Sequence, residues 1–445
     1  MMSKLIPRRD FVGRMAAAGA AFHVVPRNVL GGAGFRAPSD TLNVACIGVG
    51  GMGGSDVRGM STENIYALCD VDDRRGARSF GEFPQAKRYR DFRVMLEREA
   101  DNIDAVTVST PDHTHAVAAM MALDMGKHVY CQKPLTRTIW EAQQLMDAAR
   151  SSGVATQMGN QGHSWEGTRQ IREWVEAGWI GTVREIQYWT NRPIWPQAIE
   201  RPLEMYHTPH HFDWDLWLGP APERPYHPAY APFNWRGWWD YGTGALGDIA
   251  CHAMDAAFWA LELGYPTSIE AESTQLFEET APAVSRIAYH FPARGNRQEI
   301  KVVWRDGNLT PPRPFDLAEA DSWPPGSSGQ LWVGDEGTLL AGIYGDGPRL
   351  VNASRHAELM ASPPTETYAR TEGVYVEWID ACKSGGKAGS DFATHSGPLT
   401  EMVLLGNLAV RAAKALELDP STGQVTNTEI PEEYVKPTYR QGWGW

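Results

Sequence analysis

Two separate segments of the chain carry side chains that could act together on an alcohol. Asp248 and His252 lie four residues apart in a segment with helical periodicity that runs to residue 263, so a helix would present both on one face. A histidine, with an unperturbed pKa of about 6.5, suits removal of a hydroxyl proton, and a carboxylate can orient its ring and stabilise its cation. Lys133 precedes Pro134 at the end of an expected strand, where burial would lower the pKa of the lysine and let it hydrogen-bond a substrate hydroxyl. The pattern predicts acid–base chemistry on a hydroxyl group.

Each of these residues also has a purely structural interpretation. Asp248 would be only the N-cap of a helix, His252 a hydrogen-bonded core histidine, and Lys133 a surface lysine. The chemical interpretation is favoured because the two segments occur together, but the residues alone leave both open.

A glycine-rich turn follows the first expected strand and opens a helix. Its members are Gly48, Gly50, Gly51, Met52 and Gly53. Glycines let the backbone turn tightly and approach a pyrophosphate, which the helix N-terminus attracts. Asp70 ends the second strand 22 residues after Gly48, where its carboxylate can accept hydrogen bonds from ribose hydroxyls. This predicts a dinucleotide site that prefers NAD to NADP, because Asp70 would repel a 2′-phosphate, although Arg74 and Arg75 weaken that preference.

Ligands of such sheets bind where the strands end. We therefore expect cofactor contacts from the residues that follow the later strands, namely Ser109, Thr110, Pro111, His113, His115, Gln132, Lys133 and Asn160. An equally weighted alternative for the first of these loops is a helix entry, with Thr110 or Asp112 as the cap and the two histidines solvated.

The framework expected around these residues alternates strands and helices. Strands are predicted at 41–49, 65–69, 105–109, 128–131 and 154–158, and helices at 55–59, 113–125 and 139–150. This pattern predicts a doubly wound parallel sheet of the Rossmann type over residues 38–160.

A second α/β domain is expected over residues 161–445. Its predicted strands, at 183–190, 268–276, 284–291 and 299–304, indicate an open, mostly antiparallel sheet, and its predicted helices lie at 166–177, 374–382 and 399–416. Eleven of the 18 tryptophans lie between residues 165 and 259. Indole faces stack on sugar rings, so Trp195 and Trp235, in irregular segments, are candidates for a substrate pocket.

Several classes of function are excluded or disfavoured by composition. Asp and Glu outnumber Lys and Arg by 54 to 41, for a net charge of −13, and no basic stripe is present, so nucleic acid is not expected as a partner. No apolar run reaches the roughly 18 residues that a membrane span needs. The five cysteines are odd in number and widely spaced, which argues against a disulfide framework or a zinc ribbon. His207, His210 and His211 cluster, but Pro209 interrupts any helix that would align them, so no metal site is expected.

Residues 1–37 differ in kind from the rest of the chain. Arg8 and Arg9 precede Phe11 and Val12, and a weakly apolar stretch of small residues follows. This pattern is typical of a twin-arginine export signal and predicts a periplasmic protein. No cysteine closely follows the stretch, so no membrane anchor is expected. The alternative is a basic N-terminus that contains two arginines by chance.

The motifs together resemble the glucose-fructose oxidoreductase, inositol dehydrogenase and MocA (Gfo/Idh/MocA) family over roughly residues 41–420. The resemblance rests on the glycine turn with Asp70, on Lys133-Pro134, on the Asp248 and His252 pair, and on the segments 160–163 and 213–220, which are similar to motifs of exported bacterial members. It implies that Lys133, Asp248 and His252 form the catalytic set, with His252 as proton acceptor and donor. It also implies a C-terminal sheet that forms a subunit interface, and hence a homo-oligomer.

The resemblance places Gln161 and His163 beside the substrate. The chain departs from the family's common Glu-Lys-Pro, because position 132 is Gln, which leaves the pKa of the lysine and the preferred cofactor state open.

The activity expected is hydride transfer between NAD and a secondary hydroxyl of a sugar, sugar derivative or cyclitol. Export would require that NAD be tightly bound and regenerated on the protein. Two alternatives stay open from the sequence. One is an NAD-dependent glycoside hydrolase that oxidises its substrate transiently, and the other is a sugar-binding protein that keeps the dinucleotide as structure.

Overall fold

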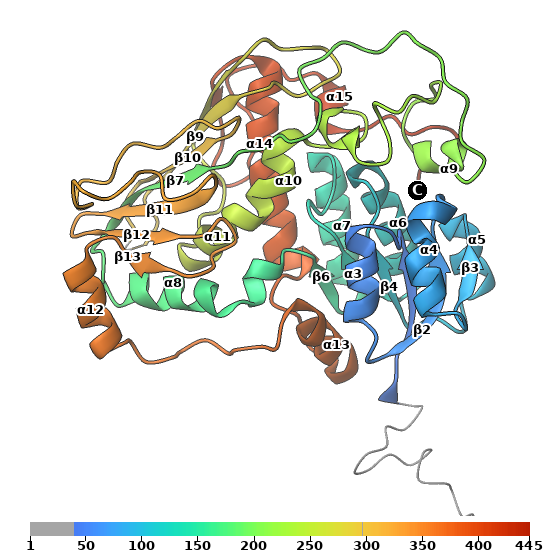
Figure 1. Cartoon of the computed structure of the whole chain (residues 1–445), viewed down its shortest axis with the longest axis horizontal. Helices are drawn as coiled ribbons and strands as arrows, with labels where there is room; N and C mark the ends of the chain where they lie inside the picture. Colours follow the sequence, from blue (N-terminus) through green and yellow to red (C-terminus); the bar gives the residue numbers. More distant parts are fainter. Residues whose placement is uncertain (1–39, 296) are drawn as a thin grey trace, which may run out of the picture. The chain divides into compact units, whose positions relative to one another are not determined.

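A six-stranded parallel sheet carries the glycine turn and the residues around it. The computed structural model describes residues 40–295 and 297–445, so the predicted export signal lies outside the described residues. The strands follow the order β3-β2-β1-β4-β5-β6 (Figure 1). Their bounds are β1 (Asn43–Ile47), β2 (Asn64–Cys69), β3 (Lys87–Tyr89), β4 (Ala105–Val108), β5 (His128–Cys131) and β6 (Thr156–Met158). All neighbouring strands pair in parallel, which confirms the predicted doubly wound sheet.

Helices follow most of these strands, as the alternating pattern predicts. They are α3 (Met52–Gly59), α4 (Asp73–Glu82), α5 (Phe92–Arg98), α6 (Asp112–Asp124) and α7 (Ile139–Ser152). Every residue of β4 is buried, since helices on both faces leave a central parallel strand no contact with solvent. The strand order reverses between β1 and β4, and a ligand crevice is expected at such a switch point.

An eight-stranded sheet forms the second half of the molecule. Its order is β13-β12-β11-β7-β10-β9-β8-β14. The bounds are β7 (Val183–Trp189), β8 (Ser268–Ser273), β9 (Ser285–Phe291), β10 (Ile300–Arg305), β11 (Gly329–Gly334), β12 (Thr338–Ala341), β13 (Arg349–Leu350) and β14 (Leu416–Glu417). β7 and β10 pair in parallel and the other neighbours are antiparallel, so the predicted mostly antiparallel sheet is confirmed.

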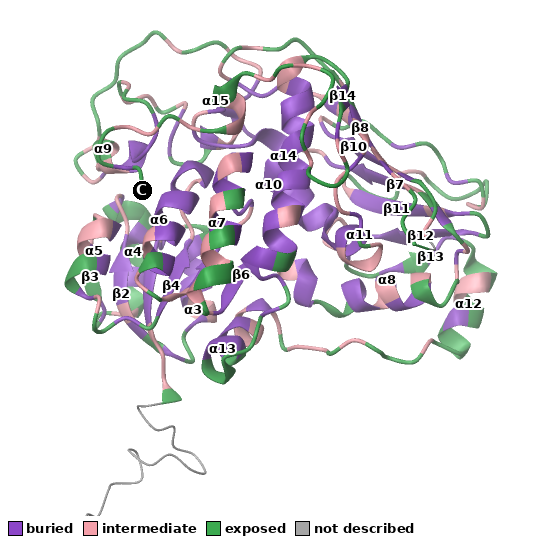
Figure 2. Ribbon diagram, turned by 180° about the vertical axis from the view of Figure 1, so that it is seen from behind, coloured by how far each residue is buried: buried purple, intermediate pink, exposed green. Residues whose placement is uncertain are grey.

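Two long buried helices join the sheets. All residues of α10 (Gly244–Ala253) are buried, and α14 (Gly397–Ala412) packs against α7, α10 and β8 (Figure 2). One hydrophobic core therefore contains residues of both sheets, and residues 43–445 form one compact unit. The helix expected from residue 247 to 263 begins earlier and is interrupted at Met254, after which α11 (Asp255–Ala260) continues.

Shorter elements complete the fold. They are η2 (Gln161–Ser164), α8 (Glu166–Glu176), α9 (Trp214–Leu218), η3 (Asn234–Gly237), α12 (Ala353–Ala361), α13 (Val374–Ser384), the π-helix η4 (Phe392–Ser396) and α15 (Glu432–Val435). Over the part of the chain that the structure describes, no helix combines the length and the hydropathy that crossing a bilayer would require.

Candidate active site

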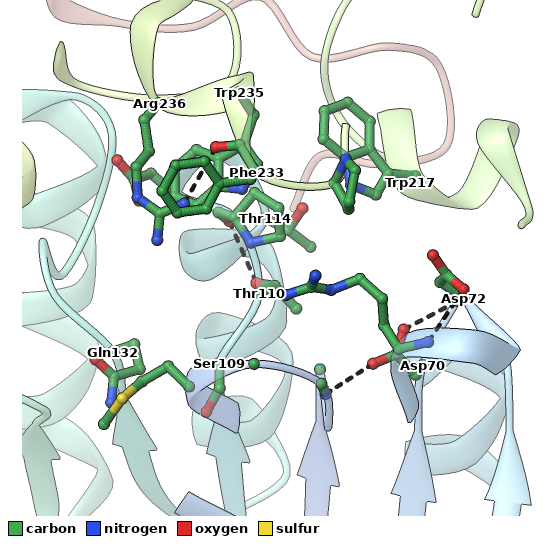
Figure 3. Close-up of a pocket in the computed structure, with 18 of the residues that line it drawn as sticks. Asp70, Asp72, Ser109, Thr110, Thr114, Gln132, Trp217, Phe233, Trp235 and Arg236 are labelled. Carbon is green, nitrogen blue, oxygen red and sulfur yellow. Dashed lines mark hydrogen bonds between the residues drawn. The ribbon is translucent and has the colours of Figure 1, made fainter. Parts of the chain in front are cut away.

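A cavity of about 470 Å³ lies over the carboxyl ends of the parallel strands. In Figure 3, Asp70 and Asp72 lie on one side of it and Gln132 on the other, and Phe233 and Trp235 face the strand ends from above. Its lining includes glycines of the glycine turn, residues 109–112 after β4, Gln132 and Lys133 after β5, and Asp248 and His252 of α10. The cavity therefore joins the predicted cofactor site to the predicted catalytic residues.

The glycine turn leaves no room for side chains. A Cβ on Gly48 would lie 2.6 Å from the carbonyl oxygen of Ser109, and Gly48 has a φ of 75°. A Cβ on Gly53 would lie 1.9 Å from the carbonyl oxygen of Gly48. Gly53 is buried beneath the turn, whereas Gly48, Gly50, Gly51 and Met52 line the cavity. The backbone of the turn is therefore tightly packed, and its outer face lines the cavity at the start of α3. A pyrophosphate bound there would meet the free N–H groups of the helix N-terminus.

Asp70 is tied to the glycine turn through its carboxylate. Oδ2 accepts hydrogen bonds from the backbone N–H groups of Val49 (2.9 Å) and Gly50 (3.2 Å), and Oδ1 accepts one from Asp72 (2.9 Å). Burial raises the pKa of Asp70, and these N–H donors counteract the rise. Since each carboxylate oxygen has two lone pairs, Oδ1 keeps one acceptor position for a ribose hydroxyl.

Arg75 is a residue whose position the sequence did not reveal. A Cβ on Gly50 would lie 2.8 Å from the Cβ of Arg75, and one on Gly51 would lie 2.7 Å from its guanidinium Nη2. The guanidinium therefore lies over the glycine turn and lines the cavity. Only the fold places the first turn of α4 against that loop, where a positive charge would meet the negative charge of a pyrophosphate.

Lys133 and Asp248 meet in the cavity. Nζ of Lys133 donates to the carbonyl oxygen of Asp248 (2.8 Å) and to its Oδ1 (3.0 Å). Nε of Arg236 donates to the same Oδ1 at 3.0 Å. Burial alone would raise the pKa of Asp248, but the charges of Lys133 and Arg236 outweigh it and lower the pKa to about 2. The carboxylate is ionised and holds two cations beside the cavity.

His252 lines the same cavity but does not bind Asp248. Its Nδ1 is buried and has no hydrogen-bond partner among residues 40–295 and 297–445, and its ring packs against Tyr344 with centroids 4.4 Å apart. Burial, and then the charge of Lys133, lower the pKa of His252 to about 3, so the ring is neutral at pH 7. The expectation that Asp248 orients His252 is therefore corrected: the carboxylate of Asp248 binds Lys133 and Arg236 through Oδ1 and makes no hydrogen bond to His252.

The hydrogen bonds of Gln132 give a reason for an amide at the position where the family commonly has the Glu of Glu-Lys-Pro. Its Nε2 donates to both carboxylate oxygens of Asp56, at 3.1 and 3.0 Å, and Ser109 Oγ (2.7 Å) and Tyr375 OH (2.8 Å) donate to the same group. Asp56 is fully buried, and its burial raises its pKa. A glutamate at position 132 would place a second carboxylate against this one, whereas an amide supplies a donor.

The two predicted histidines of the β4 loop do not reach the cavity. The ring nitrogens of His115 lie 2.8 Å from the carbonyl oxygens of Thr110 and Pro134, and His113 is bound in the same way by two carbonyls of the second half of the chain. Burial lowers the pKa of His113 to about 3 and that of His115 to about 4. A neutral imidazole has one N–H, so each ring donates to one of its two carbonyl neighbours and helps to fix the loops that line the cavity.

Of the other predicted site residues, some line the cavity and some do not. Those that line the cavity are Ser109, Thr110, Pro111, Gln161, Trp195 and Trp235. Asn160 and His163 lie outside it, and both bind Asp255. None of His207, His210 and His211 belongs to a group of three potential metal ligands in the described part of the chain.

An aromatic wall faces the strand ends. The guanidinium of Arg236 lies 4.6 Å from the ring of Phe233 and 4.3 Å from that of Trp235 (Figure 3). It lies 5.7 Å from the ring of Trp195, and all three distances are within the range of cation–π attraction. Apolar ring faces beside two cations and a carboxylate suit a ligand with a carbon ring and several hydroxyl groups.

The doubly wound sheet, its glycine turn and the adjoining α/β half are the architecture of a two-part dinucleotide-binding protein. Residues 42–160 match the NAD-binding Rossmann-fold model of the Gfo/Idh/MocA oxidoreductase family, and residues 169–302 match the model of its C-terminal α/β domain. The chain belongs to the Gfo/Idh/MocA family.

Curated relatives are distant and match in part. The chain is 25% identical over 147 residues to the inositol 2-dehydrogenase of Salmonella typhimurium, which covers 32% of this chain and 43% of that protein. It is 24% identical over 228 residues to the levoglucosan dehydrogenase of Pseudarthrobacter phenanthrenivorans, covering 48% and 50%. The matches span half or less of the length of these relatives.

Solved structures share the fold over most of the chain. The WlbA dehydrogenase of Bordetella pertussis, in complex with NADH and UDP-GlcNAcA, matches with a TM-score of 0.58 and 15% identity over 85% of this chain and 99% of that one. A levoglucosan dehydrogenase in complex with NADH and levoglucosan matches with a TM-score of 0.58 and 18% identity, over 85% and 100%.

Proposed function

We propose that the protein is an NAD-dependent dehydrogenase that oxidises a secondary hydroxyl of a sugar, sugar derivative or cyclitol. The observation that carries the proposal is that Lys133, from the nucleotide-binding half, and His252, from α10, line one cavity together with the glycine turn and Asp70. The names of the relatives support it, since one is an inositol dehydrogenase and another a levoglucosan dehydrogenase solved with its sugar and NADH.

Each catalytic side chain has a task that follows from its contacts. The Lys133 ammonium uses two of its three donors on Asp248, so the third remains to hydrogen-bond the substrate oxygen. Burial keeps His252 neutral and makes it a weak base. It can still accept the hydroxyl proton, because that proton becomes strongly acidic as the hydride leaves the carbinol carbon. Asp248 holds Lys133 in place and offsets its charge. When bound, NAD supplies the carbon that receives the hydride, so that the carbinol becomes a ketone.

NAD is proposed over NADP because the carboxylate of Asp70, after the end of β2, would repel a 2′-phosphate. Arg75, over the glycine turn, is then a partner for the pyrophosphate. Export through the N-terminal twin-arginine segment, a periplasmic location and tight NAD binding belong to the same proposal and rest on the sequence pattern. The homo-oligomeric state is also proposed, and it rests on the family resemblance.

The test compares Lys133→Met with the wild-type protein and with Lys414→Met, a control at an exposed lysine of the second half. The proteins are incubated with myo-inositol, levoglucosan and a panel of hexoses and glycosides, and the absorbance of reduced cofactor is followed together with the release of aglycone. We expect lasting reduction by wild type and Lys414→Met, and a loss of about 100-fold or more in Lys133→Met with NAD still bound. Undiminished turnover in Lys133→Met would refute the proposed role, and transient reduction with released aglycone would identify a glycoside hydrolase instead.

A further inference from the structure

A group of two histidines and one aspartate is buried outside the cavity, where elements from distant parts of the chain meet. His163 comes from η2, Asp255 opens α11, and His395 belongs to the π-helix η4. Nδ1 of His163 lies 3.1 Å from each carboxylate oxygen of Asp255, and Nε2 of His395 makes a hydrogen bond of 2.6 Å with Oδ1. The three side chains are 2%, 1% and 6% exposed, and none lines the cavity.

We propose that His163, Asp255 and His395 bind one divalent transition-metal ion, with zinc as the ion that the ligand set fits best. Two imidazoles and one carboxylate are a common protein ligand set for zinc. One ligand atom of each residue lies within 4.8 Å of the other two, so a single ion can contact all three. Because the residues come from positions far apart in the sequence, neither spacing nor motif indicated the group.

The surroundings of Asp255 match those of a metal-binding carboxylate. Nδ2 of Asn160 donates to Oδ1 of Asp255 at 2.8 Å, and Oγ of Ser390 donates to Oδ1 of Asn160 at 2.7 Å. Such outer hydrogen bonds fix the orientation of metal ligands. They leave Oδ2 of Asp255 with Nδ1 of His163 as its hydrogen-bond partner, so Oδ2 has a free lone pair for an ion.

A glycine gives the group its space. A Cβ on Gly389 would lie 2.9 Å from Cδ2 and 3.0 Å from Nε2 of His163, and 2.7 Å from Oε1 of Glu377. The chain that leads into η4 therefore passes close to His163 because it carries no side chain there. A π-helix is a costly local geometry that recurs at functional sites, and here it is the element that supplies His395.

Metal binding and protonation compete for the same atoms. In the hydrogen-bonded state, each imidazole points an N–H at Asp255; in the metal-bound state, the same nitrogen offers its lone pair, and its proton moves to the other ring nitrogen or leaves. The ion would link η2, which begins with the cavity residue Gln161, to α11, which continues directly from the helix of His252. Its role is structural, since no side chain of the group reaches the cavity, and the proposal does not depend on the proposed activity.

The first measurement is the metal content of the full-length protein, purified without a polyhistidine tag and without chelators. We expect about one zinc per chain in wild type and at least a tenfold weaker retention in His395→Gln. Glutamine keeps an amide N–H near the position of Nε2, so this variant can still donate to Asp255 and fold. The matched control is His356→Gln, at a half-buried position on α12, which should keep the metal.

The second measurement is thermal unfolding with chelator and after return of zinc, manganese or cobalt. Binding to the native state alone raises the midpoint, so we expect a fall on chelation that zinc reverses in wild type and His356→Gln, and no response in His395→Gln. The proposal is overturned if wild type holds no metal and none of the three ions shifts its midpoint, in which case the group is a hydrogen-bonded core network. Equal metal content in wild type and His395→Gln would also overturn it.

Discussion

The two sides of the cavity are built from different parts of the polypeptide. The cofactor side is built around tightly packed backbone: the turn at residues 48–53 approaches Ser109, at the end of β4, and Arg75, in α4, so closely that even a methyl group would collide. The substrate side is made of side chains from the irregular segment between β7 and α10, where Trp195, Phe233 and Trp235 surround Arg236. Steric exclusion thus shapes the first side, and packing and charge shape the second.

This difference has a reason in the packing. The irregular segment contains only short elements, α9 and η3, and is held by a separate hydrophobic cluster that includes Phe212, Trp217, Trp238 and Tyr241. Because this segment has its own hydrophobic cluster, residues that line the cavity there can be substituted without disturbing the parallel sheet. We therefore expect substitutions on the cofactor side to affect folding and NAD together, and those on the substrate side to affect substrate alone.

The largest effect is expected for Gly53→Ala on the cofactor side. The new Cβ would overlap the carbonyl oxygen of Gly48, so the turn must open, and the free energy of unfolding should fall by about 3 kcal/mol with loss of NAD binding. Urea unfolding and NAD titration measure both. Gly81→Ala, in α4 with nothing near the new Cβ, is the matched control and should stabilise by about 0.5–1 kcal/mol. If Gly53→Ala were as stable as wild type, close backbone packing would not shape the cofactor side of the cavity.

The next effect is expected for Gln132→Glu, at the junction of the two sides. A second carboxylate against the buried Asp56 should lower the free energy of unfolding by about 3 kcal/mol. Adding Asp56→Asn removes the repulsion and should restore most of the stability, which denaturant unfolding of the single and double variants would show. If Gln132→Glu alone is as stable as wild type, the amide is not required by Asp56.

A smaller effect concerns His252 and pH. Its folded-state pKa of about 3 lies below its unfolded value of about 6.5, so the unfolded chain binds a proton that the folded one does not, and stability falls as pH falls from about 6.5 toward 3. Between pH 7 and pH 5 this residue should account for about 2 kcal/mol of lost stability. His252→Gln should remove that part of the loss. Parallel stability curves for wild type and variant would show that His252 is not buried as a neutral ring.

Sequence reasoning succeeded where local signals were strong. The glycine turn, Asp70 and the alternating strands predicted the parallel sheet. The motifs also predicted that Lys133 and His252 lie at the same site, and both line one cavity. The short elements β3 and α5 gave no usable periodicity, since β3 has three residues, two of them exposed.

The partners of the site residues could not be predicted from spacing. Arg236 reaches Asp248 from a one-turn helix in an irregular segment, and Arg75 meets the glycine turn only because α4 packs beside α3. His163 was expected beside the substrate, yet it lies outside the cavity, where it binds Asp255 together with His395. Contacts between residues so far apart are set by tertiary packing, which a single sequence does not display.

The central claim, that Lys133 and His252 act on the same substrate hydroxyl, is tested most directly by single-turnover reduction of bound NAD. The rates of Lys133→Met, His252→Gln and the double variant are compared with wild type at saturating substrate. We predict that each single change slows hydride transfer by about 100-fold or more, and that the double variant is little slower than the slower single one, because the residues work as a unit. A double variant whose loss equals the product of the two single losses would show that the residues act independently and would contradict the account.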